Sequence, residues 1–124
     1  MNIPAELKYT KTHEWVSVSG NKAKVGITDY AQHEITDVVH VELPQNGISV
    51  KKEQPAAVVE SVKSAFDIYS PLSGKIIETN EELLSSPELL NSDPYAKGFL
   101  FTVEFSDEKE LDSLLSATDY QNII

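Results

Sequence analysis

A strongly strand-forming stretch lies at the middle of the chain: Val58-Val59-Glu60-Ser61-Val62-Lys63-Ser64-Ala65-Phe66-Asp67-Ile68-Tyr69-Ser70-Pro71. It predicts two strands, over residues 56–62 and 65–69, which only Lys63 and Ser64 separate. Strands this close in sequence must pair as a tight hairpin. Strand alternation puts Val58, Glu60 and Val62 on one face and Val59, Ser61 and Lys63 on the other. The hairpin therefore presents Lys63 at its tip, where the amine is sterically free.

The segments around this hairpin also favour β-structure. Residues 13–26 predict a second hairpin, because apolar residues flank the turn signal Ser19-Gly20-Asn21. Further strands are expected over residues 38–43, 75–78 and 98–105. The sequence thus predicts a mainly β architecture, a small barrel-sandwich with short helices added in the N-terminal half and at the C-terminal end.

Capping patterns predict where these helices begin. Thr28 can cap a short helix over residues 29–34. The other predicted starts are Thr79 with Glu82, Ser86 before Pro87, and Asp107 with Glu110. The apolar face of the last helix is expected to consist of Leu111, Leu114 and Leu115.

Length and composition limit the classes of protein that fit. The chain of 124 residues, 40% of them hydrophobic, suits one domain over residues 1–124 with a core over about 8–120. It has no cysteine, which excludes disulfides, thiol nucleophiles and cysteine-ligated metals. No apolar run is long enough to span a bilayer, and the N-terminus does not resemble a targeting peptide, so we expect a cytoplasmic protein.

Charge and motif searches argue against several functions. Ten basic and twenty acidic residues give a net charge of −10, which disfavours nucleic acid and anionic membranes and favours a basic protein partner. Catalytic and nucleotide-binding motifs are absent. His13, His33 and His40 lack the spacing of metal ligands. We therefore expect neither an enzyme nor a metalloprotein, and by spacing alone Lys63 is an ordinary solvated turn lysine.

Several motifs nevertheless resemble signatures of the glycine cleavage H-protein family. They are residues 8–16 (Lys-Tyr-Thr-Lys-Thr-His-Glu-Trp-Val), 25–32, 41–44, 59–63 (Val-Glu-Ser-Val-Lys), 86–91 and 93–95. These matches follow the expected order from about residue 8 to 120. The resemblance implies a lipoyl-carrier fold in which Lys63 bears lipoate in amide linkage and the protein catalyses nothing itself.

The resemblance also implies the partners. A pyridoxal-phosphate glycine decarboxylase would load the dithiolane with an aminomethyl group, a tetrahydrofolate-dependent aminomethyltransferase would unload it, and a flavin dihydrolipoamide dehydrogenase would reoxidise the dithiol. A lipoate ligase or a lipoyl or octanoyl transferase would modify Lys63. Glu60 would serve recognition by that enzyme, and Glu14, Asp67 and Thr12 would contact the loaded arm. We expect a monomer.

Some positions depart from the family pattern, and alternatives stay open. Thr36 stands where the family usually has glycine, Glu53-Gln54 lacks a turn glycine, His40 replaces an aromatic residue, and Phe66 is bulkier than usual. Biotin carriers have methionine on both sides of the lysine, and lipoyl domains of 2-oxo-acid dehydrogenases usually have aspartate before it; neither pattern fits Val62-Lys63-Ser64. An H-like protein for lipoyl relay or redox signalling, and an unmodified interaction module, remain alternatives.

Overall fold

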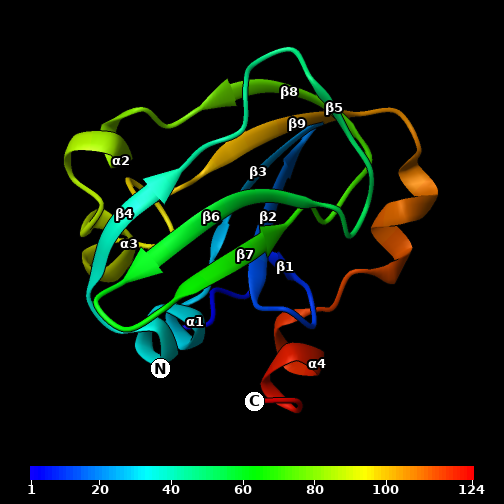
Figure 1. The fold of residues 1–124 in the computed structure, drawn as a ribbon. Coiled ribbons are helices and arrows are strands. Elements are labelled where there is room, and N and C mark those ends of the chain that lie inside the picture. The colour runs from blue at the N-terminus through cyan, green and yellow to red at the C-terminus, as the bar shows by residue number, and fades with distance from the viewer.

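Two antiparallel sheets form a sandwich in the computed structural model, which describes residues 1–124 (Figure 1). The first sheet has the strand order β1 (Lys8–Tyr9), β2 (Glu14–Ser19), β3 (Lys22–Ile27), β9 (Phe101–Phe105), β8 (Gly74–Thr79) and β5 (Ser49–Val50). The second has the order β4 (Val38–Glu42), β6 (Pro55–Ser61) and β7 (Ala65–Tyr69). The predicted mainly β, sandwich-like fold is confirmed.

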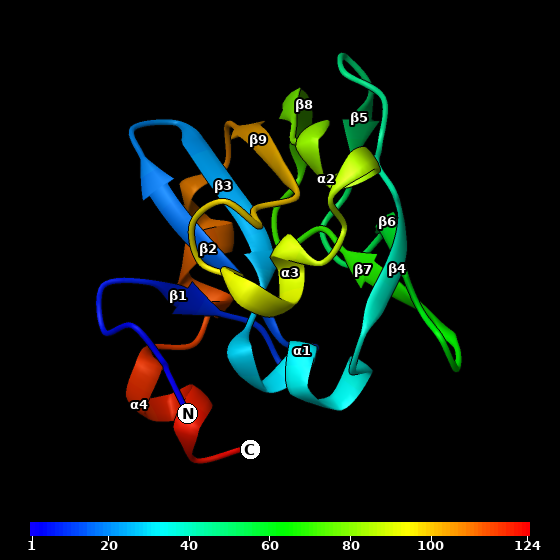
Figure 2. The same cartoon turned by 90° about the vertical axis from the view of Figure 1, so that its left-hand side faces the viewer.

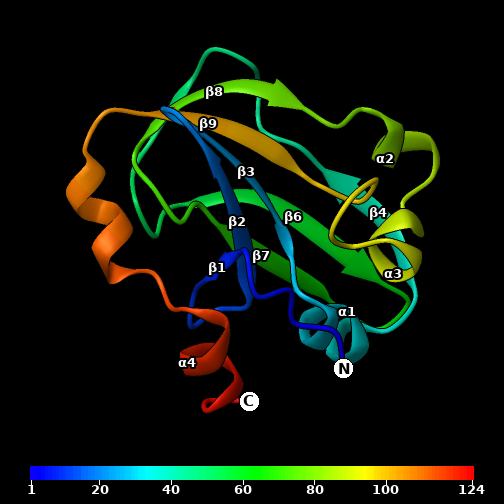
Figure 3. The ribbon, with the colours of Figure 1, turned by 180° about the vertical axis from the view of Figure 1, so that it is seen from behind.

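Short helices lie around the sandwich. They are α1 (Asp29–Ile35), α2 (Glu82–Ser85), α3 (Leu89–Ser92), the 3₁₀ helix η1 (Glu108–Ser113) and α4 (Ala117–Gln121). Helices α2 and α3 lie at one end of the sheets and η1 at the other, as the front and back views agree (Figures 1 and 3). No helix has the length and apolar character that crossing a bilayer would require.

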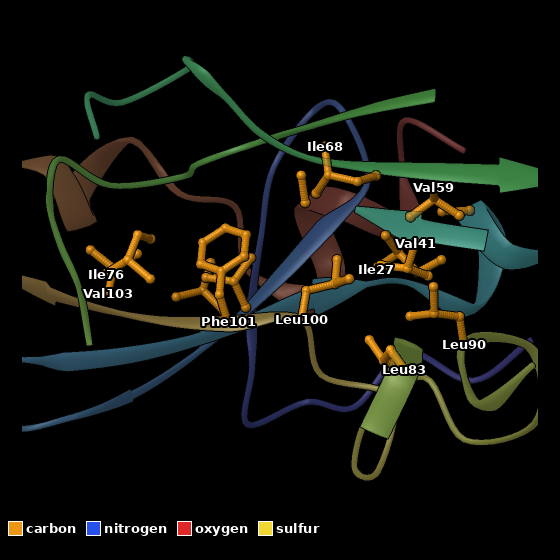
Figure 4. Close-up of a cluster of buried hydrophobic side chains, with 14 of the residues drawn as sticks. Ile27, Val41, Val59, Ile68, Ile76, Leu83, Leu90, Leu100, Phe101 and Val103 are labelled. Atoms are coloured by element: carbon orange, nitrogen blue, oxygen red, sulfur yellow. The ribbon is translucent and has the colours of Figure 1, made fainter. Parts of the chain in front are cut away.

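The core joins both sheets and the short helices (Figure 4). Residues of β8 and β9 such as Ile76 and Phe101 share a cluster of 20 buried side chains with Val59 of β6, and Leu83 and Leu90 from α2 and α3 close one end. A second, smaller cluster consists of Leu7, Tyr9, Trp15 and Tyr120. This second cluster packs the C-terminal helix α4 against β1 and β2, beside the loop that joins these two strands.

The two predicted hairpins are confirmed, with small shifts at their ends. Gly20 has φ +63° at the turn between β2 and β3, where Ser19 pairs with Lys22. In the central hairpin Glu60 pairs with Ala65, and β6 ends at Ser61, one residue before the predicted end. Strands β4 and β8 lie within one residue of the predicted ranges.

Strand β9 begins three residues later than predicted. The reason is the backbone of Gly98, whose N–H donates to the carbonyl of Asp93 at 2.8 Å. A Cβ at Gly98 would lie 2.7 Å from the carbonyl oxygens of both Asp93 and Leu89. Gly98 and Phe99 therefore belong to the turn after α3, and the first hydrogen bond to the sheet is that of the Leu100 N–H to the Val25 carbonyl, at 2.8 Å.

The helix starts agree only in part with the capping patterns. Thr28 caps α1, because its hydroxyl accepts the N–H of Ala31 at 3.1 Å. The predicted capping box of Thr79 and Glu82 is wrong, because Thr79 is the last residue of β8 and α2 has no side-chain cap. The side chain of Asn80 instead ties this turn to the carbonyls of Lys97 and Phe99, at 2.6 and 2.8 Å.

The two later helix starts are also corrected. Helix α3 begins at Leu89, and Ser86 contributes its carbonyl rather than its hydroxyl, accepting the Leu89 N–H at 3.2 Å. Asp107 does cap η1, by accepting the Lys109 N–H at 3.0 Å, but Glu110 turns away to bind Ser73. The expected apolar face of this helix is divided: Leu111 and Leu114 pack on the main core and Leu115 on the second cluster.

Candidate functional site

The tip of the β6–β7 hairpin projects from the sandwich and carries Lys63 (Figure 2). The buried hydroxyl of Ser61 accepts the backbone N–H groups of Lys63 and Ser64, each at 3.2 Å. The Ser61 N–H in turn donates to the Ser64 carbonyl at 2.8 Å. Ser61 therefore orders the turn from below, while the Lys63 side chain is exposed and its ammonium forms no hydrogen bond or ion pair.

The expected alternation of faces stops at Ser61, where the strand ends. Val62 and Lys63 lie in the turn and are both exposed, Val62 at 66%. The expectation that Lys63 shares the inner face with Val59 and Ser61 is therefore wrong, although its position at the tip agrees with the prediction. The reason is that side-chain alternation applies only to extended backbone.

Glu60 lies on the outer face of the three-stranded sheet, half-buried, three residues before the tip. Its neighbour on β4 is the exposed His40, and its neighbour on β7 is Ala65. The Glu60 carboxylate accepts no hydrogen bond from the chain, so it is free to meet a partner. Asp67 is also exposed and lies opposite Val58.

A cleft of about 500 Å³ opens beyond the other end of β7. Its walls come from four separate segments: the β1–β2 loop with Thr10, Lys11, Thr12 and Glu14; Lys52 and Glu53; Tyr69, Ser70 and Pro71; and Ser113 with Leu114. The walls are tied together, since Lys52 donates to the Ser113 hydroxyl and Glu110 accepts the N–H and hydroxyl of Ser73 at 2.7 and 2.8 Å. These hydrogen bonds hold the segments around the cleft in place.

Glu14 is the buried acid of this cleft, with 1% of its surface exposed. The hydroxyls of Thr10 and Thr12 each donate to its Oε1 at 2.5 Å, and the backbone N–H of Tyr69 donates to Oε2 at 3.2 Å. Burial raises the pKa of Glu14, although these three hydrogen bonds oppose the shift. A carboxylate has about four acceptor positions, so Oε2 can accept one further hydrogen bond.

The cleft and the tip lie at opposite ends of β7. Tyr69 lies six positions after Lys63, which corresponds to at most about 20 Å of extended chain. The predicted contact residues Thr12 and Glu14 lie together in the cleft, whereas Asp67 lies outside it on β7, between the tip and Tyr69. Sequence reasoning missed Thr10 and the Tyr69 amide as partners of Glu14. Thr10 reaches Glu14 through the turn of the β1–β2 loop, and Tyr69 is 55 positions away in sequence.

A family model described as Glycine cleavage H-protein matches residues 7–124. The chain belongs to the glycine cleavage H-protein family. A glycine cleavage system H protein of Endomicrobium trichonymphae is 71% identical over 124 residues, which cover the whole of both chains. One from Thermotoga maritima is 56% identical over 114 residues, 92% of each chain. The crystal structure of one from Mycobacterium marinum has a TM-score of 0.86 and 32% identity, covering 98% of this chain and 100% of that one.

The family resemblance seen in the sequence is thereby confirmed. Membership in the H-protein family makes this chain a lipoate-bearing carrier component of the glycine cleavage system and not one of its catalysts. This role agrees with a hairpin tip that exposes the amine of Lys63.

The departures from the H-protein pattern now have structural consequences. Thr36 and Glu53, which replace usual glycines, have φ +68° and +69°, the left-handed region that glycine adopts without strain. Phe66 lies opposite the buried Val59 but remains partly exposed near the tip. The first two substitutions thus strain the backbone, and Phe66 adds apolar surface close to Lys63.

Proposed function

We propose that this H protein carries lipoate in amide linkage on Lys63. The observation that carries the proposal is the ordered hairpin turn, which leaves the Lys63 amine exposed and unpaired while Ser61 holds the backbone beneath it. The dithiolane would accept an aminomethyl group from a pyridoxal-phosphate glycine decarboxylase, pass it to a tetrahydrofolate-dependent aminomethyltransferase, and be reoxidised by dihydrolipoamide dehydrogenase.

The dimensions of the fold suit such an arm. A lipoyl-lysine side chain has about 14 bonds from Cα to the far sulfur, which corresponds to an extended reach of roughly 17 Å. Because Lys63 and Ser64 lie in the turn, Tyr69 is at most about 20 Å of chain from Lys63, and the strand from Ala65 to Tyr69 accounts for about 13 Å of this span. An arm laid along β7 would therefore pass Asp67 and bring its end to the edge of the cleft that Thr12 and Glu14 line.

We propose that Glu14, Asp67 and Thr12 contact the loaded arm and keep its amine protonated. An amine whose lone pair is free can expel the sulfur as a thiolate and leave a methylene iminium ion, which water hydrolyses to formaldehyde and ammonia. Protonation of the amine prevents this. Glu14 Oε2 has an acceptor position for the ammonium, and Thr12 fixes the carboxylate through its 2.5 Å hydrogen bond. Asp67, two residues before Tyr69, adds a second negative charge beside the path of the arm.

Enzymes must also recognise the hairpin. We propose that Glu60, exposed on one side beside the tip, meets a basic surface of a lipoate ligase or a lipoyl or octanoyl transferase. The net charge of −10 favours protein partners with basic surfaces over nucleic acid or anionic membranes. A monomer in the cytoplasm remains our prediction for the free carrier.

The test of the main proposal is mass spectrometry of the native protein with peptide mapping, followed by glycine decarboxylation in a reconstituted system. We expect one lipoyl group, on Lys63, and loss of both modification and activity in Lys63→Arg. Lys75→Arg, an exposed strand lysine, is the matched control and should behave as wild type. A lipoyl group on another lysine, or an active Lys63→Arg variant, would contradict the proposal; a modified but inactive wild type would favour a relay role.

The arm contacts have their own test. Wild type and the Glu14→Gln/Asp67→Asn variant are loaded with the aminomethyl group, and formaldehyde release is followed without aminomethyltransferase. We expect release to be on the order of tenfold faster in the variant, because a partly sheltered charge-assisted hydrogen bond is lost. Equal rates in equally folded proteins would show that these carboxylates do not protect the arm.

A further inference from the structure

The loop that carries Thr12 and Glu14 is attached to the C-terminal segment at both of its ends. Next to the loop, Tyr9 and Leu115 exchange backbone hydrogen bonds of 2.8 and 2.7 Å. Inside the loop, the His13 ring nitrogen Nδ1 lies 2.8 Å from the hydroxyl of Tyr120, a residue of α4. The loop conformation therefore depends on residues about a hundred positions away in sequence.

Tyr120 is buried at the centre of this attachment. Its ring stacks on Tyr9, with centroids 4.8 Å apart and planes at 9°. Its hydroxyl also lies 2.7 Å from the Thr28 hydroxyl, which already accepts the Ala31 N–H. A consistent arrangement of protons has Thr28 donating to Tyr120 and Tyr120 donating to His13. The hydroxyl thus links α1, α4 and the β1–β2 loop.

His13 is the residue through which this link reaches the cleft. It stands between Thr12 and Glu14 and has φ +72°, a conformation that few residues other than glycine adopt freely. Its ring packs between Tyr30, at 4.8 Å, and Tyr120, at 5.7 Å between centroids. Its backbone is also held, because its N–H donates to the Thr10 carbonyl at 3.2 Å and its carbonyl accepts the Thr28 N–H at 3.1 Å. The ring and the backbone of His13 are thus both fixed between Thr12 and Glu14, which line the cleft.

We propose that Tyr120 is a positioning residue: its hydroxyl holds His13 and thereby sets the geometry of Thr12 and Glu14 for the arm. The inference rests on the proposed function of the cleft, because it gives that site a support from the C-terminal helix. The contrary view is that the hydroxyl only anchors α4. The two views differ in what happens to Glu14 and its partners when the hydroxyl is removed.

Tyr120→Phe removes the hydroxyl and keeps the ring stack. Tyr9→Phe is the matched control, since it removes a buried hydroxyl of the same cluster that donates to the Pro4 carbonyl at 2.6 Å and not to the loop. The readout is amide hydrogen exchange in the unmodified protein, at the Tyr69 N–H that donates to Glu14. We expect this amide to exchange about fivefold faster in Tyr120→Phe, with no change in Tyr9→Phe.

Two internal comparisons separate positioning from general loosening. Amides of β8 and β9 should keep their wild-type exchange rates in Tyr120→Phe, because the effect is local. His13→Asn, which tolerates positive φ but lacks the ring, should reproduce the acceleration, and adding Tyr120→Phe to it should change nothing further. An unchanged Tyr69 amide, or an acceleration shared equally by β8 and β9, would overturn the inference.

Formaldehyde release from the loaded protein links the inference to function. Glu14→Gln should accelerate release, Tyr120→Phe should do so by about fivefold, and Tyr9→Phe should not. If Glu14→Gln has no effect, the proposed role of the cleft fails, independently of the exchange result. If Glu14→Gln accelerates release but Tyr120→Phe matches Tyr9→Phe, the positioning role of Tyr120 fails.

Discussion

The carboxylate of Glu14 accepts the backbone N–H of Tyr69 at 3.2 Å, and this contact joins the two sheets of the sandwich. Glu14 is the first residue of β2 in the six-stranded sheet, and Tyr69 is the last residue of β7 in the three-stranded sheet. A carboxylate that is 1% exposed therefore bridges the sheets at the cleft. Its ionisation should be visible in the stability of the whole fold.

The pH dependence of stability should reveal Glu14. Burial raises its pKa above the ordinary 4.5, so the folded state binds its proton more tightly than the unfolded state. The contribution to the free energy of unfolding is complete below about pH 4.5 and is lost as the pH rises through the folded pKa. Urea unfolding of wild type and Glu14→Gln across pH 4–7.5 measures this as a difference that falls with pH. A difference that stays constant or rises would contradict the prediction; Glu42→Gln, an exposed acid, is the control.

Thr36→Gly should stabilise the protein by about 1 kcal/mol. Thr36 has φ +68° and ψ −149°, a region essentially restricted to glycine, which costs a β-branched residue about 1–3 kcal/mol, against about 0.5–1 kcal/mol for the extra flexibility of glycine. Only its backbone is bonded, to Gln32 and Asn91, so the change removes no hydrogen bond. Denaturant unfolding measures the gain. Asp37→Gly, at the next position and at an ordinary φ, should be destabilising. A loss of stability in both variants would show that Thr36 does not strain the backbone.

Gly26→Ala should destabilise the protein by about 2–3 kcal/mol. A Cβ at this position would lie 2.6 Å from the indole ring of Trp15, which is buried and donates to the Pro94 carbonyl at 2.9 Å. The ring must move and its hydrogen bond must weaken. In Gly26→Ala the unfolding temperature should fall and the tryptophan fluorescence should change with it. The stability of Lys22→Ala, a substitution of an exposed residue on the same strand, should stay within about 0.5 kcal/mol of wild type. Unchanged fluorescence in Gly26→Ala would show that the site has room.

Glu60→Gln should slow lipoylation while leaving stability unchanged. The carboxylate is partly exposed beside the tip and unpaired. Its removal should weaken the attraction to a basic enzyme surface by up to about 1 kcal/mol, which corresponds to a lipoylation rate about fivefold lower. Rates are measured at enzyme concentrations below saturation and at low ionic strength, where the charge is least screened. Glu42→Gln, on the neighbouring strand, is the control. Equal lipoylation rates for wild type and both variants would show that Glu60 is only a solvated surface acid.

Local sequence patterns determined the parts of this protein that depend on nearby residues. The two hairpins, the Thr28 cap and the position of Lys63 at a turn follow from strand propensity, turn residues and short spacing, which act within a few positions. Where two local patterns competed, prediction was poorer. Thr79 suits a capping box but also extends β8, and pairing with β9 decided in favour of the strand.

Tertiary structure alone decided the cleft and its buried acid. Glu14 meets Thr12 through local geometry, but the Tyr69 amide, the Ser113 wall and the Tyr120 support come from distant segments that only folding brings together. Sequence could identify Glu14 as a family residue but not as a buried one, because burial depends on which sheets and loops cover a side chain. The local sequence thus determines that a lysine lies at a hairpin tip, whereas the raised pKa of Glu14 results from the desolvation that tertiary packing imposes.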